Sequence, residues 1–152
     1  MRSQPGGSEP EPSVTGGDVW VSNGLNGVVY RFDPRKKKVV QTVTLPGGAD
    51  AIAAGENGVW VADKTAGAVV RVDPSTGAAG SPIRVGAGAS AVAVGAGAVW
   101  VVNVGEGSVS RVDPASGQVT TVSLTKPSEL CCVAVGERGV WVTLTGPPPP
   151  PY

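Results

Sequence analysis

The chain of 152 residues contains no histidine, and only one methionine, one phenylalanine and two cysteines. It therefore lacks the side chain that most often serves as a general base near neutral pH. Twelve Lys and Arg residues balance twelve Asp and Glu residues, so there is no net positive charge to attract nucleic acid. No apolar stretch approaches a membrane span, and no secretion signal opens the chain. These absences predict a soluble protein that binds neither nucleic acid nor membrane.

The sequence does contain a tandem repeat. The triplet Val-Trp-Val occurs four times, at intervals of 40, 40 and 41 residues, around Trp20, Trp60, Trp100 and Trp141. A second motif, Arg-x-Asp-Pro, recurs in the same frame and supplies Arg31, Asp33, Arg71, Asp73, Arg111 and Asp113. A period of about 40 residues with strand-type sequence is typical of propeller blades. Residues that recur in every unit are expected to maintain the repeat, with each arginine bracing the next hairpin.

Each full period contains four short apolar runs separated by turn residues, which predicts four strands per unit. In the second and third units these runs are 51–54, 59–63, 68–73, 81–85, 91–94, 99–103, 108–113 and 118–124. The incomplete first and fourth units supply 19–23, 28–33, 38–45, 131–135 and 140–144, with a weak further strand near 13–15. The predicted fold is therefore all-β, a β-propeller fragment of about three four-stranded blades plus part of a fourth.

Three segments divide the chain by composition. Residues 1–17 and 146–152 are rich in Pro, Gly, Ser or Glu without alternation, which predicts a disordered N-terminal tail and a Pro-rich C-terminal tail. The partial propeller would occupy residues 18–145. The last four residues fit the Pro-Pro-x-Tyr pattern that WW domains bind, but a plain linker is the simpler interpretation.

Three local expectations follow from the repeat. The Asp-Pro pairs start turns that Gly77 and Gly117 close in the left-handed region, and Lys37 takes the same place in the first unit at a steric cost. Trp60 and Trp100 should be interior residues packed between blades. Cys131 and Cys132 are adjacent, and since neighbouring strand residues point to opposite faces, packing is favoured over a disulfide.

The phrases Gly-x-Val-Trp-Val-x-Asn and Val-x-Arg-Val-Asp-Pro-x-x-Gly resemble bacterial YVTN/NHL-type β-propellers, including the streptogramin-lyase-like group, over residues 18–145. The resemblance implies a propeller fold, and since such propellers usually have six or seven blades, about half of one. Lyase chemistry in that group is associated with histidine and a divalent metal. The chain has no histidine, so no catalytic residue is carried over.

A candidate ligand-binding rim lies in the loops. Blade topology brings the loops after the second strands to the same face as the entry to the first strands, and these loops carry Asn23, Asp50, Asp63, Asn103 and Glu106. Their oxygen atoms suit a hard cation such as Ca²⁺. Ordinary turn chemistry explains the same residues, because Asn and Asp favour tight hairpins.

The sequence predicts a non-catalytic binding or protein-interaction module, without a resident cofactor. A protein or small ligand would bind the loop face, and self-association could complete the propeller. A streptogramin-lyase-like enzyme is the alternative, and a truncated fragment without independent function is a third hypothesis.

Overall fold

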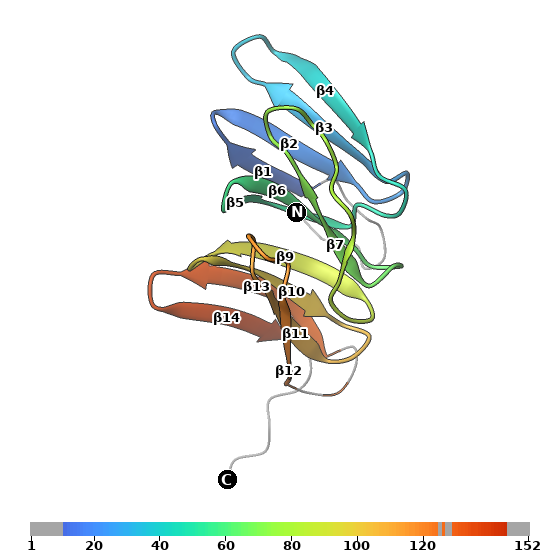
Figure 1. The fold of residues 1–152 in the computed structure, drawn as a ribbon, viewed down its shortest axis with the longest axis vertical. Helices are drawn as coiled ribbons and strands as arrows, with labels where there is room; N and C mark the ends of the chain where they lie inside the picture. Colours follow the sequence, from blue (N-terminus) through green and yellow to red (C-terminus); the bar gives the residue numbers. More distant parts are fainter. Residues whose placement is uncertain (1–10, 125, 127–128, 146–152) are drawn as a thin grey trace.

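The computed structural model describes residues 11–124, 126 and 129–145, which form four antiparallel sheets (Figure 1). The first sheet contains β1 (Glu11–Thr15), β2 (Asp18–Asn23), β3 (Val28–Asp33) and β4 (Lys38–Thr44). The second contains β5 (Ala51–Gly55), β6 (Gly58–Asp63), β7 (Ala68–Val72) and β8 (Ile83–Arg84). The third contains β9 (Ala89–Gly95), β10 (Ala98–Asn103), β11 (Ser108–Val112) and β12 (Val119–Ser123), and the last is the hairpin β13 (Leu130–Gly136) and β14 (Gly139–Leu144).

Each four-stranded sheet is a meander whose strands pair in chain order, which confirms the all-β fold of three blades plus part of a fourth. The sheets stack one after another along the long axis of the molecule (Figure 1). The first strands of successive sheets contact each other, β1 with β5, β5 with β9 and β9 with β13. They are therefore the innermost strands, where the small side chains of β5 and β9 allow close approach. Within the described ranges no helix is suited to crossing a membrane.

The stacking of the sheets explains why the triplet Val-Trp-Val contains no polar residue. Neighbouring strand residues point to opposite faces, so the tryptophan faces the following sheet and its two valines face the preceding one. Between the first and second sheets, Trp20 packs with Val29, Val43 and Leu45 of its own unit against Ile52, Val59, Val61, Val70 and Val72. Between the second and third sheets, Trp60, Val69 and Val85 pack against Val99, Val101 and Val112. Middle strands are buried on both faces, which removes polar alternation from their sequence.

The N-terminal boundary predicted from the sequence is wrong. The expected disordered tail of residues 1–17 contains β1, which pairs with β2 from Glu11 opposite Ser22 to Thr15 opposite Asp18. The weak strand expected near 13–15 is present and begins two residues earlier, at Glu11, so the expected tail and the expected strand overlapped and the strand is the correct one. Residues 1–10 and 146–152, including the Pro-Pro-x-Tyr pattern, lie outside the described residues.

The Asp-Pro turns match their prediction. Gly77 and Gly117 have φ angles of 75° and 72°, and Lys37 has a φ of 53°. The Gly77 amide donates to the Asp73 carbonyl at 2.8 Å, and Gly117 bonds Asp113 in the same way. Lys37 therefore adopts a conformation that costs a residue with a Cβ about 1 kcal/mol.

The expectation for the cysteines is also wrong. The structure joins Cys131 and Cys132 by a disulfide, and both residues are exposed. The pairing register of β13 shifts between Leu130, opposite Leu144, and Cys132, opposite Thr143. Such a bulge interrupts the alternation of side chains between faces, and the sequence argument had assumed regular alternation.

Candidate functional site

The four equivalent tryptophans become less buried from the N-terminal to the C-terminal unit. Trp20 and Trp60 are 0% and 1% exposed, Trp100 is half-buried, and Trp141 is 68% exposed. The prediction of an interior position is confirmed for Trp60 and is too strong for Trp100. Each tryptophan needs the following sheet to cover it, and the sheet after Trp100 has only two strands in the described part of the chain.

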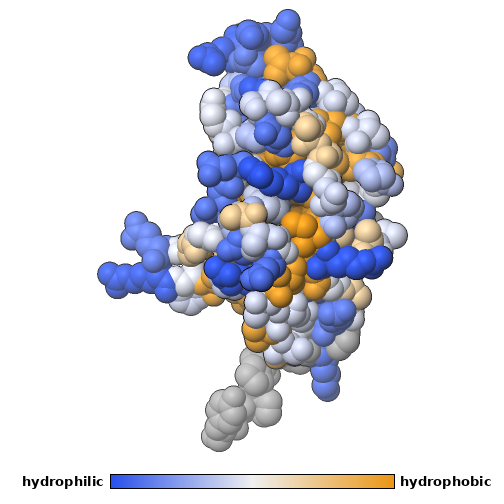
Figure 2. Space-filling view, in the orientation of Figure 1, coloured by the Kyte–Doolittle hydropathy of each residue, from blue (hydrophilic) through white to orange (hydrophobic). Residues whose placement is uncertain are grey.

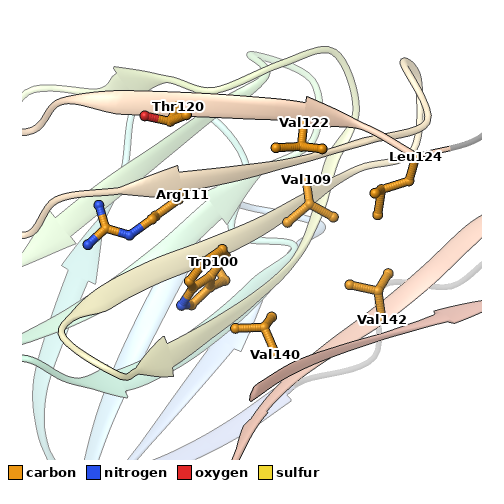
Figure 3. Close-up of a pocket in the computed structure, with 8 residues that line it drawn as sticks. All are labelled: Trp100, Val109, Arg111, Thr120, Val122, Leu124, Val140 and Val142. Carbon is orange, nitrogen blue, oxygen red and sulfur yellow. The ribbon is translucent and has the colours of Figure 1, made fainter. Parts of the chain in front are cut away.

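An apolar groove of about 270 Å³ opens where the cover is incomplete (Figure 3). One wall belongs to the third sheet and is formed by Trp100, Val109, Arg111, Thr120, Val122 and Leu124. The other wall belongs to β14 and is formed by Val140 and Val142. In Figure 3 these two valines face the side chains of the third sheet across the gap. We call this feature the end groove.

The repeat shows what the end groove lacks. Residues at the same repeat positions as those of its apolar wall are covered by the following sheet in the first two sheets. In the first sheet they are Trp20, Val29, Val43 and Leu45. In the second sheet they are Trp60, Val69, Ile83 and Val85. Val140 and Val142 correspond to Val99 and Val101 on β10. No described residue takes the place of Val70 and Val72, which β7 contributes to the first interface. The end groove is thus a blade interface without the third strand of its second blade.

The opposite end of the stack is an apolar sheet face. Strand register aligns Val14 with Val19, Val19 with Phe32, and Phe32 with Val39 in one row across the first sheet. This face is opposite to Trp20, which points toward the second sheet. Val19, Val21, Tyr30 and Phe32 occupy the same repeat positions as Val59, Val61, Val70 and Val72 on β6 and β7, which are buried. We call this feature the N-terminal face.

Exposed hydrophobic side chains are confined to the end units. Among the described residues, the large exposed hydrophobic side chains are Val14, Leu25, Val39, Val40, Val122, Leu124, Trp141 and Leu144. Four come from the first sheet and its loop, and four from the third sheet and the C-terminal hairpin. Figure 2 shows hydrophobic surface both near the top, over the first sheet, and in the lower half, over the third. The middle sheet, covered on both faces, contributes none.

The predicted loop rim is divided into pairs. Asp50 and Asp63 lie together beside Gly48, where an added Cβ would be 2.8 Å from the Asp50 Oδ2 and 3.2 Å from the Asp63 Oδ1. The Asp63 Oδ1 accepts a hydrogen bond from the Ala66 amide at 2.9 Å, and the Asp50 Oδ2 accepts one from the Lys64 amide at 2.8 Å. Asp63 therefore braces its own turn, and Asp50 ties the segment that enters β5 to the turn after β6.

Asn103 and Glu106 form the second pair, at the entry to the third sheet. The buried Asn103 Nδ2 donates to the hydroxyls of Ser108 and Ser110, at 3.1 and 2.9 Å. The Glu106 Oε1 accepts from the Ala87 amide at 3.0 Å. These contacts tie the loop after β10 to the segment that enters β9.

Asn23 is separate and accepts a hydrogen bond from the Leu25 amide at 3.1 Å. Within the described ranges, no three acidic or cysteine side chains gather in a group that could hold a metal ion. The rim residues thus serve local turns, as their residue types favour, and binding of Ca²⁺ stays a prediction.

The repeated arginines have different partners. Arg31 donates from Nε to Asp18 at 2.6 Å and from NH1 to the Pro74 carbonyl of the next unit at 3.0 Å. It therefore braces the next hairpin, as predicted. Gly58 stands at the position of Asp18 in the second unit, and Arg71 donates instead to the carbonyl of Asn57. The brace found at Arg31 is consequently not reproduced at Arg71.

The repeated aspartates are structural acceptors. Hydrogen bonds from the Ser75 hydroxyl and from the Thr76 and Ser75 amides lower the pKa of Asp73 from 3.8 to about 2. The pKa of Asp33 is lowered chiefly by the Lys36 amide. The pKa of Asp113 is lowered chiefly by the amide and hydroxyl of Ser116. A carboxylate whose pKa is lowered is a weaker general base near neutral pH.

The end groove escaped the sequence analysis, which looked for polar residues in loops. Its apolar lining consists of Trp100, Leu124 and four valines, which are the same kinds of residue as the core residues of the other units. The signal was present in the repeat alignment, because Val122 and Leu124 have buried counterparts and no third or fourth strand follows β14 in the predicted pattern.

Similar solved structures define the class of protein, and all of these matches are below 25% identity, so they show the fold alone. Hydrazine synthase of Kuenenia stuttgartiensis matches with a TM-score of 0.80 and 16% identity, over 89% of this chain and 42% of that chain. Glutaminyl cyclase of Myxococcus xanthus gives a TM-score of 0.62 and 14% identity, over 88% of this chain and 66% of that one. The computationally designed Ika4 protein gives 0.69 and 13%, over 88% and 83%. The chain is built of propeller blades and spans less than half of the hydrazine synthase chain.

The family is also established. A model described as a repeat of unknown function (DUF6923) matches residues 13–136, which is most of the chain, and the protein belongs to this family. The match begins inside β1, in agreement with the corrected N-terminal boundary. No curated protein matches the sequence. The matching model is described only as a repeat of unknown function, so the resemblance to YVTN/NHL-type proteins is supported at the level of the propeller fold.

Proposed function

We propose that the chain is a non-catalytic protein-interaction module whose partner binds at the end groove. The observation that carries this proposal is the exposure of Val122 and Leu124, at 54% and 51%. Their counterparts Val43, Leu45 and Val85 are buried beneath the next sheet. Exposed apolar surface of this kind marks interaction sites in proteins.

The free edge of β14 indicates how a partner would bind at the proposed site. β14 pairs with β13 on one side, and within the described residues no strand pairs with its other side. An unpaired edge offers backbone donors and acceptors to an added strand. The partner would therefore be an extended segment that bonds to β14 and places alternate apolar side chains in the end groove.

A binding role is favoured over catalysis by the chemistry of the chain. The sequence has no histidine, and the aspartates with a lowered pKa are held in turns by several hydrogen bonds each. This weakens the streptogramin-lyase-like alternative. The activities named for hydrazine synthase and glutaminyl cyclase are not transferred, because low identity shows only the fold. A ligand on the loop face is a lesser proposal, since the carboxylates of Asp50, Asp63 and Glu106 already accept hydrogen bonds from backbone amides.

A peptide titration tests the proposed function. The probe is a synthetic peptide with the sequence of residues 68–85, which supplies a third and fourth strand with Val70 and Val72 on the groove side. We expect saturable binding and a blue shift of the fluorescence from Trp100, which lines the groove. The matched control is the same peptide with Val70→Asp and Val72→Asp, which should bind at least tenfold more weakly. Equal binding of both peptides, or no binding of either, would overturn the proposal.

A further inference from the structure

Resting on the proposed function, we propose that the partner at the end groove is a second copy of this chain, bound head-to-tail by exchange of strands. The β3–β4 hairpin of one copy adds to the free edge of β14 in the other. The β13–β14 hairpin thereby takes the place of β1–β2 in the copy that it joins. Each composite blade then contains two inner strands from one copy and two outer strands from the other.

The N-terminal face supplies the side chains that the end groove lacks. Tyr30 and Phe32 on β3 occupy the repeat positions of Val70 and Val72, which fill the equivalent space against Trp20. Tyr30 and Phe32 are half-buried. In the composite blade they would cover Val122 and Leu124 of the other copy, as larger versions of the valines found at the complete interface.

On the face of the composite blade that carries the tryptophan, the exchange replaces one Val-Trp-Val triplet by another. Val140, Trp141 and Val142 repeat the triplet of Val19, Trp20 and Val21. Trp20 faces the second sheet and is fully buried there, whereas Trp141 is 68% exposed. In the composite blade Trp141 would enter the position of Trp20, against the second sheet of the other copy. Pairing of β14 with β3 replaces pairing of β2 with β3.

The first strand of the displaced hairpin is short. β1 has five residues, one of them Pro12, which has no amide hydrogen to donate. Val14 on the same strand is 64% exposed. β13 and β14 have seven and six residues, and Leu130 of β13 is 3% exposed. The exchange therefore gives up β1 and β2, with Trp141 taking over the buried position of Trp20, and it gains cover for Val122, Leu124 and Tyr30.

Two copies joined in this way have enough blades to form a closed ring. Each copy contributes two whole sheets, the second and third, and two half-sheets. Two copies then supply four whole and two composite blades, which makes six. Propellers contain about four to eight blades, and a two-fold dimer whose two contacts are equivalent is a closed assembly. The ring leaves neither the end groove nor the N-terminal face open.

Molar mass by light scattering after size exclusion is the first test, on the full chain over a range of concentrations. We expect a species of twice the chain mass that dissociates on dilution. Phe32→Asp and Val122→Asp should each weaken the dimer at least tenfold, because each places a carboxylate in both contacts. Ser123→Asp is the matched control on β12, since its side chain points away from the end groove, and it should leave the dimer intact.

Mixing the two variants tests the head-to-tail geometry. In a mixed dimer of Phe32→Asp with Val122→Asp, one contact carries both substitutions and the other carries none. We therefore expect dimer to reappear on mixing. Both substituted side chains lie outside the monomer core, and circular dichroism checks that the variants fold. Failure of the mixture to recover any dimer would overturn the head-to-tail arrangement.

Hydrogen exchange separates strand exchange from rigid docking. On going from dilute to concentrated protein, we expect amides of β14 to become protected and amides of β1 to lose protection. A dimer in which β1 stays protected would overturn the exchange. A wild-type protein that remains monomeric at high concentration would overturn the whole inference, yet binding of the peptide with sequence 68–85 would still support the proposed function. Failure of both experiments would reject both.

Discussion

A tryptophan in this repeat is buried by its neighbour in the next unit, not by its own strand. Trp60 and Trp141 lie in the same local sequence, between two valines and on a second strand, but their exposed fractions are 1% and 68%. The difference comes from Val99, Val101 and Val112, which cover Trp60 and have no counterpart beyond Trp141 among the residues that the structure describes. The contribution of each tryptophan to stability should follow its cover.

Substitution of single tryptophans tests this dependence. Trp60→Ala should lower the free energy of unfolding by about 3 to 5 kcal/mol, because it leaves a cavity between two sheets. Trp141→Ala is the matched control, with the same residue type and motif, and should cost less than about 1 kcal/mol. Chemical denaturation at low protein concentration gives both values. Similar losses for the two variants would show that Trp141 is buried in solution.

At the level of elements, the strands could be predicted from the sequence because the repeat presents each one three or four times. The runs 28–33, 59–63 and 140–144 reappear as β3, β6 and β14 within one residue at either end. β8 is shorter than its predicted run of 81–85, although a bridge between Val72 and Ala79 extends the pairing. β1 is only weakly predicted, because its residues 11–15 do not share the alanine-rich sequence of its counterparts β5 and β9.

The turns between third and fourth strands predict a dependence of stability on acid. The pKa of Asp73 is lowered from 3.8 to about 2 by hydrogen bonds from Ser75 and Thr76, so the folded state binds this proton less readily than the unfolded state. The resulting stabilisation is complete above about pH 4 and is lost as the pH falls toward 2. Unfolding midpoints between pH 2 and 6 should therefore fall less steeply for Asp73→Asn than for the wild type.

A second variant identifies the cause of the shift. Ser75→Ala removes the hydroxyl that lowers the pKa of Asp73 most, so NMR titration of the carboxyl carbon should show this pKa rising toward 3.8. An unchanged pKa in Ser75→Ala would mean that the backbone amides alone are responsible. Equal acid sensitivity of Asp73→Asn and the wild type would show that this turn does not contribute to the dependence of stability on pH.

For the whole molecule, the sequence predicts the number and order of the blades but not the site. The rim residues Asn23, Asp50 and Glu106 are chosen by residue type, and residue type does not show that a carboxylate or amide already accepts a hydrogen bond from a backbone amide of its own or a neighbouring segment. The end groove depends on which equivalent valines remain uncovered, which requires the stacking of the sheets. The ion pair of Arg31 with Asp18 is likewise absent from the repeat pattern, because Gly58 and Ala98 replace the aspartate in later units.

The central claim is that the stack of sheets ends in an uncovered interface. The most direct test measures the solvent accessibility of the four tryptophans, one at a time, in dilute protein. Each single-tryptophan protein has the other three replaced by Phe, and acrylamide quenching reports the exposure of the one that remains. We expect weak quenching for Trp20 and Trp60, intermediate quenching for Trp100 and strong quenching for Trp141. Equal shielding of Trp60 and Trp141 in the monomer would contradict the central claim, because the final interface would then be closed within a single chain.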